Sequence, residues 1–229
     1  MEKTALLVGA TGLVGRALLA QLLDAEDYAQ VITLSRRRID LQHARLRQVV
    51  CDFDEMALRA PELSAEDVYC CLGTTLRQAG DKARFLRVDY DYVMQLATLM
   101  RQHGARHFIL LSALGASERS LFFYSRVKGR LERDLIQLNY PCTSIFRPSL
   151  LLGERANPRL QERWAGRALS VLSPLIRGPL TDLRPVPAAQ LAQAMFAAGR
   201  RQACPGLSIY ASRDILSMAK IPSFIEQQP

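Results

Sequence analysis

The fold of this chain is decided by Thr4-Ala-Leu-Leu-Val8, followed at once by Gly9-Ala-Thr-Gly12-Leu-Val-Gly15. The first five residues are a short apolar run that stops at a glycine, which is typical of a buried strand. From Leu13 to Leu23 apolar residues recur at helical spacing, which predicts a helix. A strand, a glycine-rich turn and a helix in this order predict the start of an α/β domain.

The glycines are spaced G-x-x-G-x-x-G, whereas the standard dinucleotide-binding fingerprint reads G-x-G-x-x-G. The mechanics are the same. Gly9 permits a tight turn, Gly12 lets the backbone approach a pyrophosphate, and Gly15 lets the helix pack closely on the strand. The free N–H groups at the start of the helix then face the anion. The alternative is an ordinary glycine-rich turn, but the position between a strand and a helix favours a phosphate-binding loop.

Strand and helix patterns continue to alternate along the chain, which is typical of βαβ units. Further strands are predicted at Val31–Leu34, Arg47–Cys51, Asp67–Leu72, Arg106–Ser112, Thr143–Phe146 and Leu207–Tyr210. Further helices are predicted at Lys82–His103, Phe122–Leu138 and Ala188–Ala198. The strands are apolar throughout, which favours a sheet covered on both sides. We therefore expect an α/β fold with a doubly wound, mainly parallel, Rossmann-like sheet and helices on both faces.

The chain has 229 residues, of which 49% are hydrophobic, so it can bury a real core, which favours a folded protein over a disordered one. No apolar run approaches the ~18 residues of a membrane span, and no signal peptide is visible. Five cysteines at spacings that match no zinc site predict reduced thiols, no metal and a cytoplasmic location. The net charge is +8.

Three consecutive arginines follow the second predicted strand, where an NAD-binding fold usually offers a carboxylate to the ribose 2′-hydroxyl. Arg36 and Arg37 match a 2′-phosphate in charge and geometry, so NADP (NADPH over NADH) is the favoured cofactor. The alternative is that the arginines are a solvated surface run. The sequence therefore predicts one NAD(P)-binding domain, 1–229, with a Rossmann core over 1–150. A small C-terminal substrate lobe, with the last strand and helix, covers about 151–229.

At this point the sequence resembles the short-chain dehydrogenase/reductase superfamily in its atypical or extended branch. The resemblance begins with the glycine motif and Tyr124-Ser-Arg-Val-Lys128. The motifs Cys70-Cys-Leu-Gly-Thr-Thr75, Arg87-Val-Asp-Tyr-Asp-Tyr-Val93, Leu110-Leu-Ser-Ala-Leu-Gly-Ala116 and Phe146-Arg-Pro148 are similar to the human Tat-interactive-protein-like oxidoreductases. The resemblance implies an NAD(P)-dependent oxidoreductase of epimerase/dehydratase-like type that acts on a carbonyl or alcohol.

The spacing of Tyr124 and Lys128 has a physical reason, because residues four apart on a helix share a face. Both side chains can then meet the same substrate and nicotinamide ribose, and an ammonium nearby favours an ionised phenol. Tyr124 can give a proton to a carbonyl oxygen or take one from an alcohol while hydride moves at carbon. The alternative for such a common spacing is a solvated helix face.

The resemblance also implies a catalytic serine after the fifth strand, and Ser112 lies there. Many members of the superfamily have two serines, whereas the second position here is Ala113, so Ser117 is the alternative. The asparagine typical of the superfamily near the fourth strand is not evident, since Leu72-Gly73-Thr74-Thr75 stands in its place. These departures put efficient turnover in question and leave cofactor binding untouched.

The remaining cofactor contacts are carried over by position. The resemblance places Thr11, Gly12, Leu13 and Val14 at the pyrophosphate, Asp52 at the adenine, Leu72 and Gly73 at the adenosine ribose, and Leu151 and Arg159 on the nicotinamide side. For Asp52 the alternative is a turn carboxylate. For Leu151 and Arg159 the alternatives are core packing and surface charge.

Two functions of different class follow. The first is the NADP(H)-dependent oxidoreductase, acting on a small carbonyl or alcohol substrate. The second is a non-catalytic NADP(H)-binding redox sensor or regulator that acts through a protein partner. No nucleic-acid-binding motif accompanies the positive charge, so no nucleic acid is expected. The resemblance also implies a homodimer, because in this superfamily the long helices on the faces of the sheet commonly pair between subunits.

Overall fold

The computed structural model describes residues 3–152, 182–201 and 206–219. Its centre is a seven-stranded sheet of strand order β3-β2-β1-β4-β5-β6-β9, in which every neighbouring pair is parallel. The strands are β1 (Lys3–Val8), β2 (Tyr28–Ser35), β3 (Leu46–Val50), β4 (Asp67–Cys70), β5 (His107–Leu111), β6 (Cys142–Arg147) and β9 (Gly206–Ala211). Two further short strands, β7 (Leu151–Leu152) and β8 (Val186–Pro187), pair with each other.

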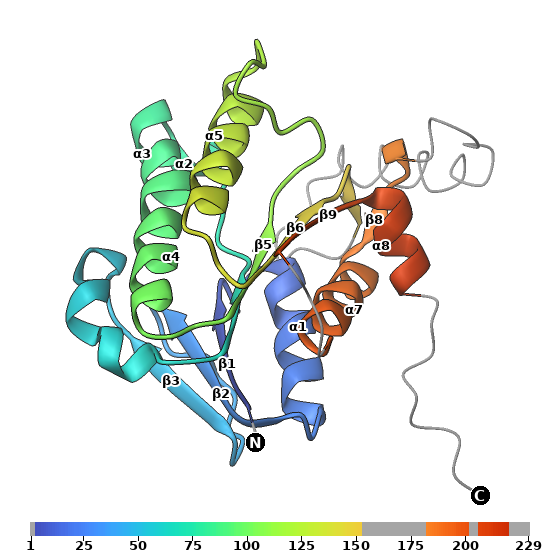
Figure 1. Cartoon of the computed structure of the whole chain (residues 1–229). Helices are drawn as coiled ribbons and strands as arrows, with labels where there is room; N and C mark the ends of the chain where they lie inside the picture. Colours follow the sequence, from blue (N-terminus) through green and yellow to red (C-terminus); the bar gives the residue numbers. More distant parts are fainter. Residues whose placement is uncertain (1–2, 153–181, 202–205, 220–229) are drawn as a thin grey trace, which may run out of the picture.

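Helices cover both faces of the sheet (Figure 1). One face carries α1 (Leu13–Asp24), α7 (Ala188–Gly199) and α8 (Ser212–Met218). The other carries α2 (Leu76–Ala79), α3 (Lys82–Leu86), α4 (Tyr92–Gln102) and α5 (Phe123–Gln137). A 3₁₀ segment, η1 (Phe53–Leu63), packs beside α4, and a π-helical segment, η2 (Arg87–Asp91), joins α3 to α4. The predicted doubly wound fold is confirmed.

The apolar strands fill both cores because successive side chains point to opposite faces. In β1, Leu6 and Val8 belong to the core beneath α4 and α5, and Ala5 and Leu7 belong to the core beneath α1 and α7. All four side chains are fully buried. A run of apolar residues without alternation is therefore the correct signal for a sheet covered on both sides.

The predicted long helix over 82–103 is present but is not uniformly α-helical. Its middle turn, Arg87–Asp91, is a π-helical segment, and such segments are frequent at functional sites. The segment η1 was missed because its turns are 3₁₀ and it contains Pro61, so it lacks an α-helical apolar period. The predicted last strand joins the main sheet beside β6. Residues 153–181 of the expected lobe, about 151–229, lie outside the described residues.

The cysteines differ in state. Cys51, Cys70 and Cys71 are free, and burial raises the pKa of Cys70 to about 11, which keeps it an unreactive thiol. Cys142 is disulfide-bonded, so the expectation of reduced thiols is wrong at this position. Cys142 lies opposite Gly206 where β6 pairs with β9. A count of cysteines and their spacing does not show which strands are neighbours, so it could not predict the state of Cys142.

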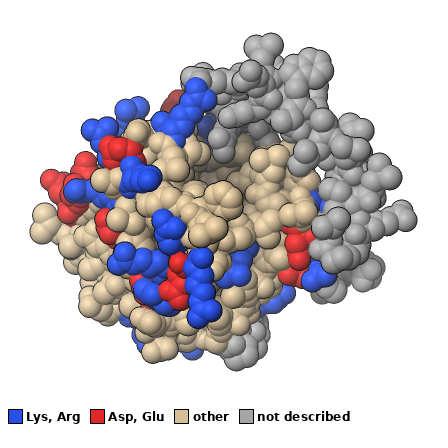
Figure 2. Space-filling view, turned by 90° about the horizontal axis from the view of Figure 1, so that it is seen from above, with Lys and Arg blue, Asp and Glu red and all other residues tan. Residues whose placement is uncertain are grey.

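Figure 2 looks down on the edge of the sheet where the strands end. Lys and Arg side chains are spread over the described part of this face, with Asp and Glu among them. The positive charge of the described residues therefore does not form a single stripe on this face. Within the described ranges, none of the helices combines the length and the apolar character that crossing a bilayer requires.

Candidate cofactor site and active site

The site lies where β1 and β4 end side by side. The chain runs from β1 outward to β2 and β3, and from β4 in the other direction, so this is the point at which the strand order reverses. Open α/β sheets bind ligands at such a point, beyond the carboxyl ends of the strands. The backbones after the two strands touch, because Cys71 N donates to Val8 O at 2.8 Å.

The phosphate loop has the predicted shape. Gly9 adopts a φ of +87°, and a Cβ there would lie 2.5 Å from Cys71 O, so only glycine fits. A Cβ on Gly15 would lie 2.1 Å from Gly9 O, which explains the close packing of α1 on the loop. Gly12 N donates back to Gly9 O at 3.0 Å, and Gly12 is the N-cap of α1. The N–H groups of Leu13, Val14 and Gly15 then open the helix without intrahelical partners, as an anion requires.

Arg36 and Arg37 follow the end of β2 on the strand next to β1. Both are exposed, and within the described ranges neither guanidinium has a hydrogen-bond or ion-pair partner. Ser35 Oγ donates to Arg37 O at 2.7 Å and so shapes the turn that carries them. Two unpaired guanidinium groups beside the phosphate loop fit a second phosphate in charge.

Lys128 is buried at the centre of the site in an ion pair that the sequence did not reveal. Its Nζ lies 2.7 Å from Asp89 Oδ1, and the two side chains are 4% and 1% exposed. Burial alone would lower the pKa of Lys128, but the charges of Asp89 and Tyr124 raise it above its usual value. Lys128 is therefore held as an ammonium. Asp89 lies in η2 and also accepts a hydrogen bond from Thr74 N at 2.7 Å.

Gly73 lies directly against this pair. A Cβ on Gly73 would be 3.2 Å from Asp89 Oδ1 and 3.7 Å from Lys128 Nζ. The lysine thus reaches the loop that follows β4, although 55 residues separate it from Gly73 along the chain. Gly73, predicted at the cofactor, and Lys128, predicted at the ribose and the tyrosine, are brought together.

Tyr124 lies on the first turn of α5, one turn before Lys128, and is half-buried. Its ring packs at 5.6 Å, centroid to centroid, against Phe85, which is fully buried on α3. The neighbouring Phe123 packs on Phe85 as well, at 5.7 Å. The base of the tyrosine is thereby anchored on α3, and its spacing of four residues from Lys128 on α5 places the two side chains on one face of the helix.

The same face of α5 carries a third polar residue, Glu132, which was missed. Ser112 Oγ donates to Glu132 Oε1, and Glu132 is also paired with Arg147, whose Nε lies 3.0 Å from Glu132 Oε2. Ser112 and Glu132 are buried. The only hydroxyl proton of Ser112 is thus directed into the protein. The signal for Glu132 was its spacing, four residues after Lys128 and eight after Tyr124.

The other predicted residues are placed less decisively. Asp52 is exposed and caps η1, where its side chain accepts from Asp54 N at 3.1 Å, as a turn carboxylate does. Leu72 packs at the edge of the core, and Leu151 lies in β7 and packs on the other core. Arg159 lies outside the described residues. Ser117, the alternative serine, is exposed before α5, where its Oγ accepts from Arg119 N.

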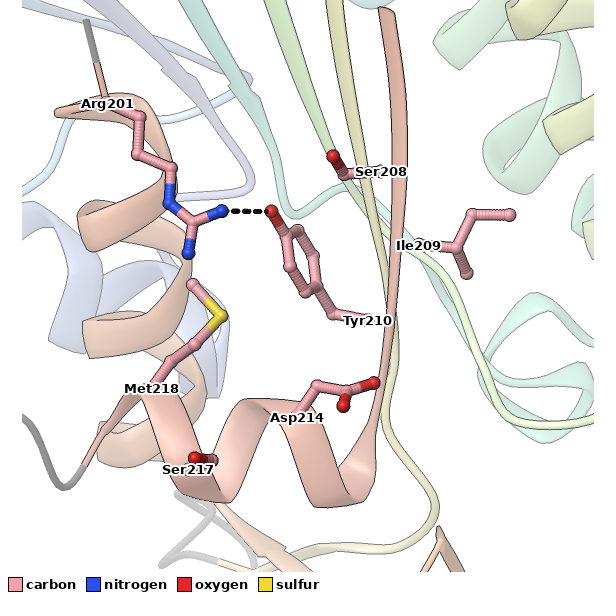
Figure 3. Close-up of a pocket in the computed structure, with 7 residues that line it drawn as sticks. All are labelled: Arg201, Ser208, Ile209, Tyr210, Asp214, Ser217 and Met218. Carbon is pink, nitrogen blue, oxygen red and sulfur yellow. Dashed lines mark hydrogen bonds between the residues drawn. The ribbon is translucent and has the colours of Figure 1, made fainter. Parts of the chain in front are cut away.

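A separate open recess of about 490 Å³ lies at β9, between that strand and α8 (Figure 3). Figure 3 shows Tyr210 pointing toward Arg201, which donates to the phenol oxygen at 2.9 Å, while Ile209 points to the other side of the strand. Its lining is Arg201, Ser208, Ile209, Tyr210, Asp214, Ser217 and Met218. Of the predicted site residues that the structure describes, none lines this recess.

A family model described as NAD(P)H-binding matches residues 9–140 of this chain. Protein HTATIP2 of Rattus norvegicus is 38% identical over 170 residues, which cover 72% of this chain and 69% of that protein. Protein FMP52-1, mitochondrial, of Scheffersomyces stipitis is 31% identical over 225 residues, covering 95% of this chain and 99% of that protein.

The mitochondrial names correct one expectation. Further relatives named FMP52, mitochondrial, from Eremothecium gossypii and Saccharomyces cerevisiae are 36% and 31% identical. The cytoplasmic location predicted from the sequence is therefore wrong. That prediction rested on cysteine usage and on a missing signal peptide, and neither distinguishes the cytoplasm from a mitochondrial location.

Among solved structures, MoeE5 in complex with UDP-glucose and NAD superposes with a TM-score of 0.68 at 17% identity, covering 94% of this chain and 80% of that one. A short chain dehydrogenase family protein from Francisella tularensis gives a TM-score of 0.68 at 12% identity, covering 93% and 99%. These likenesses support the fold. With the family model and the relatives above, they show that this chain belongs to the NAD(P)H-binding family of Rossmann-fold proteins and is homologous to HTATIP2 and FMP52.

Proposed function

We propose that this chain is an NADP(H)-dependent oxidoreductase that transfers hydride to or from a carbonyl or alcohol, with Tyr124 as the proton donor and acceptor. The observation that carries the proposal is the buried Lys128 ammonium against Gly73, at the strand ends beside the phosphate loop. Burying a lysine is costly, and stability alone is a weak reason to bury one at the point where open α/β sheets bind ligands. A nicotinamide nucleotide gives a stronger reason.

The residues have distinct roles in this proposal. The nicotinamide, when bound, supplies or accepts the hydride. Tyr124 gives its hydroxyl proton to the carbonyl oxygen while the carbonyl carbon takes up hydride, and it recovers a proton from solvent. Lys128 stabilises the phenolate that remains and orients the ribose through its other N–H groups. In the reverse direction Tyr124 accepts the proton of the alcohol.

The preference for NADP(H) rests on Arg36 and Arg37, which are exposed and unpaired at the end of β2 within the described ranges. A 2′-phosphate would receive charge-assisted hydrogen bonds from them. The MoeE5 structure named above is a complex with NAD, so the two nucleotides must be compared directly. The expected homodimer remains part of the proposal, and the relatives' names extend it to a mitochondrial location.

The substrate class follows from the chemistry and from the neighbours. MoeE5 binds UDP-glucose, and a small carbonyl or alcohol compound such as a sugar nucleotide is the starting point for a substrate screen.

The decisive experiment compares wild type with Tyr124→Phe. NADPH binding is followed by nucleotide fluorescence, and turnover is followed with a panel of carbonyl substrates. Wild type should bind NADPH, and Tyr124→Phe should bind it within about threefold but lose about 10² to 10⁴ in kcat. Failure of wild type to bind either NADPH or NADH overturns the proposal.

A second function is favoured by one observation, the hydrogen bond from Ser112 to Glu132. A serine whose proton is directed into the protein cannot donate to a substrate oxygen, and weak or absent turnover is the natural consequence. The chain would then be a non-catalytic NADP(H)-binding regulator that acts through a protein partner. Tight NADPH binding with no turnover, or with turnover insensitive to Tyr124→Phe, selects this alternative.

A further inference from the structure

The residue Asp89 connects two parts of the site that are far apart in the sequence. One carboxylate oxygen lies 2.7 Å from Lys128 Nζ, and the other accepts from Thr74 N at 2.7 Å. Thr74 belongs to the loop that follows β4 and contains Leu72 and Gly73, predicted to lie beside the adenosine ribose. Lys128 is predicted to lie beside the nicotinamide ribose. Asp89 therefore links Lys128 to the loop that is predicted to lie beside the adenosine ribose.

We propose that Asp89 is a positioning residue. It fixes the position of the Lys128 ammonium relative to the loop after β4, so that the lysine can contact both the cofactor and Tyr124. This inference deepens the proposed function and rests on it. Asp89 itself touches neither the substrate nor the reacting atoms. It acts through Lys128 and through the backbone of Thr74.

The burial of the pair supports a purpose beyond stability. The two side chains are 4% and 1% exposed, and a buried ion pair is weak evidence for stability because desolvation offsets the attraction. Such a pair is better explained by what it orients. Here one face of the pair is left to Gly73, whose missing Cβ would otherwise lie 3.2 Å from Asp89 Oδ1.

The local backbone supports it as well. Asp89 lies in the five-residue π-helical segment that interrupts the helical stretch from α3 to α4. The extra residue per turn alters which side chains face inward, and Asp89 is the only residue of the segment that is buried. Its neighbour Tyr90 points to a different partner, since it donates to Asp134 on α5 at 2.6 Å.

The experiment compares Asp89→Asn with Asp134→Asn. Both replace a carboxylate by an amide, and Asp134 binds the same π segment through Tyr90 without contact to Lys128 in the hydrogen bonds and ion pairs of the described residues. The readouts are the NADPH dissociation constant and kcat, each measured across pH. Asp89→Asn keeps an oxygen for Thr74 N but removes the charge beside Lys128.

Asp89→Asn should bind NADPH within about threefold near neutral pH and lose tenfold or more in kcat. In Asp89→Asn, the pH at which NADPH affinity and kcat fall on the alkaline side of their pH profiles (the alkaline limb) should be lower than in wild type. The reason is that Lys128 loses the neighbouring negative charge that favours its ammonium form. Asp134→Asn should leave that limb in place. If the alkaline side of the pH profile lies at the same pH in the two variants, the proposal is overturned, since a structural role predicts no difference between them.

Asp89→Glu completes the test, and carries it if Asp89→Asn does not fold. It keeps the charge, so the alkaline limb should stay at the wild-type pH while kcat falls as the lysine is displaced. Wild-type kcat and NADPH affinity in Asp89→Glu would contradict a positioning role. If wild type binds no NADPH at any pH, the proposed function itself has failed, and this outcome is distinct from normal NADPH binding with an unmoved limb.

Discussion

Two lysine–aspartate pairs lie at opposite ends of β4, and they differ in what surrounds them. At the amino end Lys3 Nζ lies 3.2 Å from Asp67 Oδ2, and the side chains are 39% and 3% exposed. At the carboxyl end the Lys128–Asp89 pair is buried on both sides, at 4% and 1%. The first lysine reaches solvent, whereas the second faces a glycine loop.

The amino-end pair is closed by side chains. Tyr28 donates to Asp67 at 2.8 Å and shares a second hydrogen bond with Tyr69, and Gly199 packs against both phenols. The carboxyl-end pair is bounded by backbone, namely Gly73 and Thr74 N. The same kind of ion pair is thus closed in by packed side chains at the amino end of β4, whereas at the carboxyl end its surroundings leave room for a ligand. Changes at the amino end should alter stability, and changes at the carboxyl end should alter binding.

The largest effect is expected from Gly199→Ala at the amino end. The new Cβ would lie 1.8 Å from the Tyr69 hydroxyl oxygen, inside a fully buried cluster. We expect a loss of about 3 kcal/mol in the free energy of unfolding, measured as a fall in Tm of about 6–12 °C. Adding Tyr69→Phe removes that oxygen and should recover part of the loss. The NADPH affinity of the folded protein should not change. A change in affinity would contradict the assignment of stability to the amino end and binding to the carboxyl end.

The next effect belongs to the carboxyl end. Replacing both Arg36 and Arg37 by Ala should weaken NADPH binding by at least about 100-fold, since each charge-assisted hydrogen bond contributes about 1.5–3 kcal/mol. NADH binding and Tm should be unaffected. Arg106→Ala is the matched control, an exposed arginine just before β5 at the other end of the sheet. Equal losses for NADPH and NADH would remove the case for a 2′-phosphate contact.

A pH effect should separate the ends as well. His107 begins β5 at the amino end, and burial, aided by Lys3, lowers its pKa to about 4. Between pH 6.5 and 4 the unfolded chain binds a proton that the folded chain does not, so stability falls as the pH falls. Denaturant titrations at pH 7 and 5 should show a loss of about 2 kcal/mol that His107→Gln lacks. The same loss in the variant would assign the effect to other groups.

The smallest effect concerns Asp52, which is both a cap and a predicted adenine contact. Asp52→Ala should cost about 1 kcal/mol of stability through loss of the cap on η1. Asp52→Asn keeps the cap, so its Tm should match wild type. NADPH titration of Asp52→Asn then isolates the adenine contact, and an unchanged dissociation constant assigns Asp52 to the turn alone.

The sequence predicts the sheet and the phosphate loop well, because both depend on local patterns. The apolar runs and the glycines after Val8 are readable within a few residues. The Lys128–Asp89 pair was not predictable in this way, since 39 residues separate its members and nothing local distinguishes a buried aspartate in Arg87–Asp91. The hydrogen bond of Ser112 was not predictable for the same reason. Its partner Glu132 is 20 residues away on α5, and only the folded structure brings the two side chains together.

The spacing of Tyr124, Lys128 and Glu132 was the one local signal that could have extended the site. A helix face that packs on the sheet and carries three polar residues at intervals of four needs partners for each. That requirement predicts buried acids and bases on the neighbouring strands and turns. It does not identify them, and Asp89 and Arg147 enter only with the structure.

Gly129 has a consequence for redesigning this protein. A Cβ there would lie 2.2 Å from Ser117 C and 2.3 Å from Glu118 N, so the start of the loop before α5 is clamped onto the helix. Beyond the clamp, Leu121 and Phe122 are 93% and 77% exposed, two residues from Tyr124 in the case of Phe122. A library that varies Leu121 and Phe122 and leaves Gly129 fixed would explore new substrates with little cost to folding.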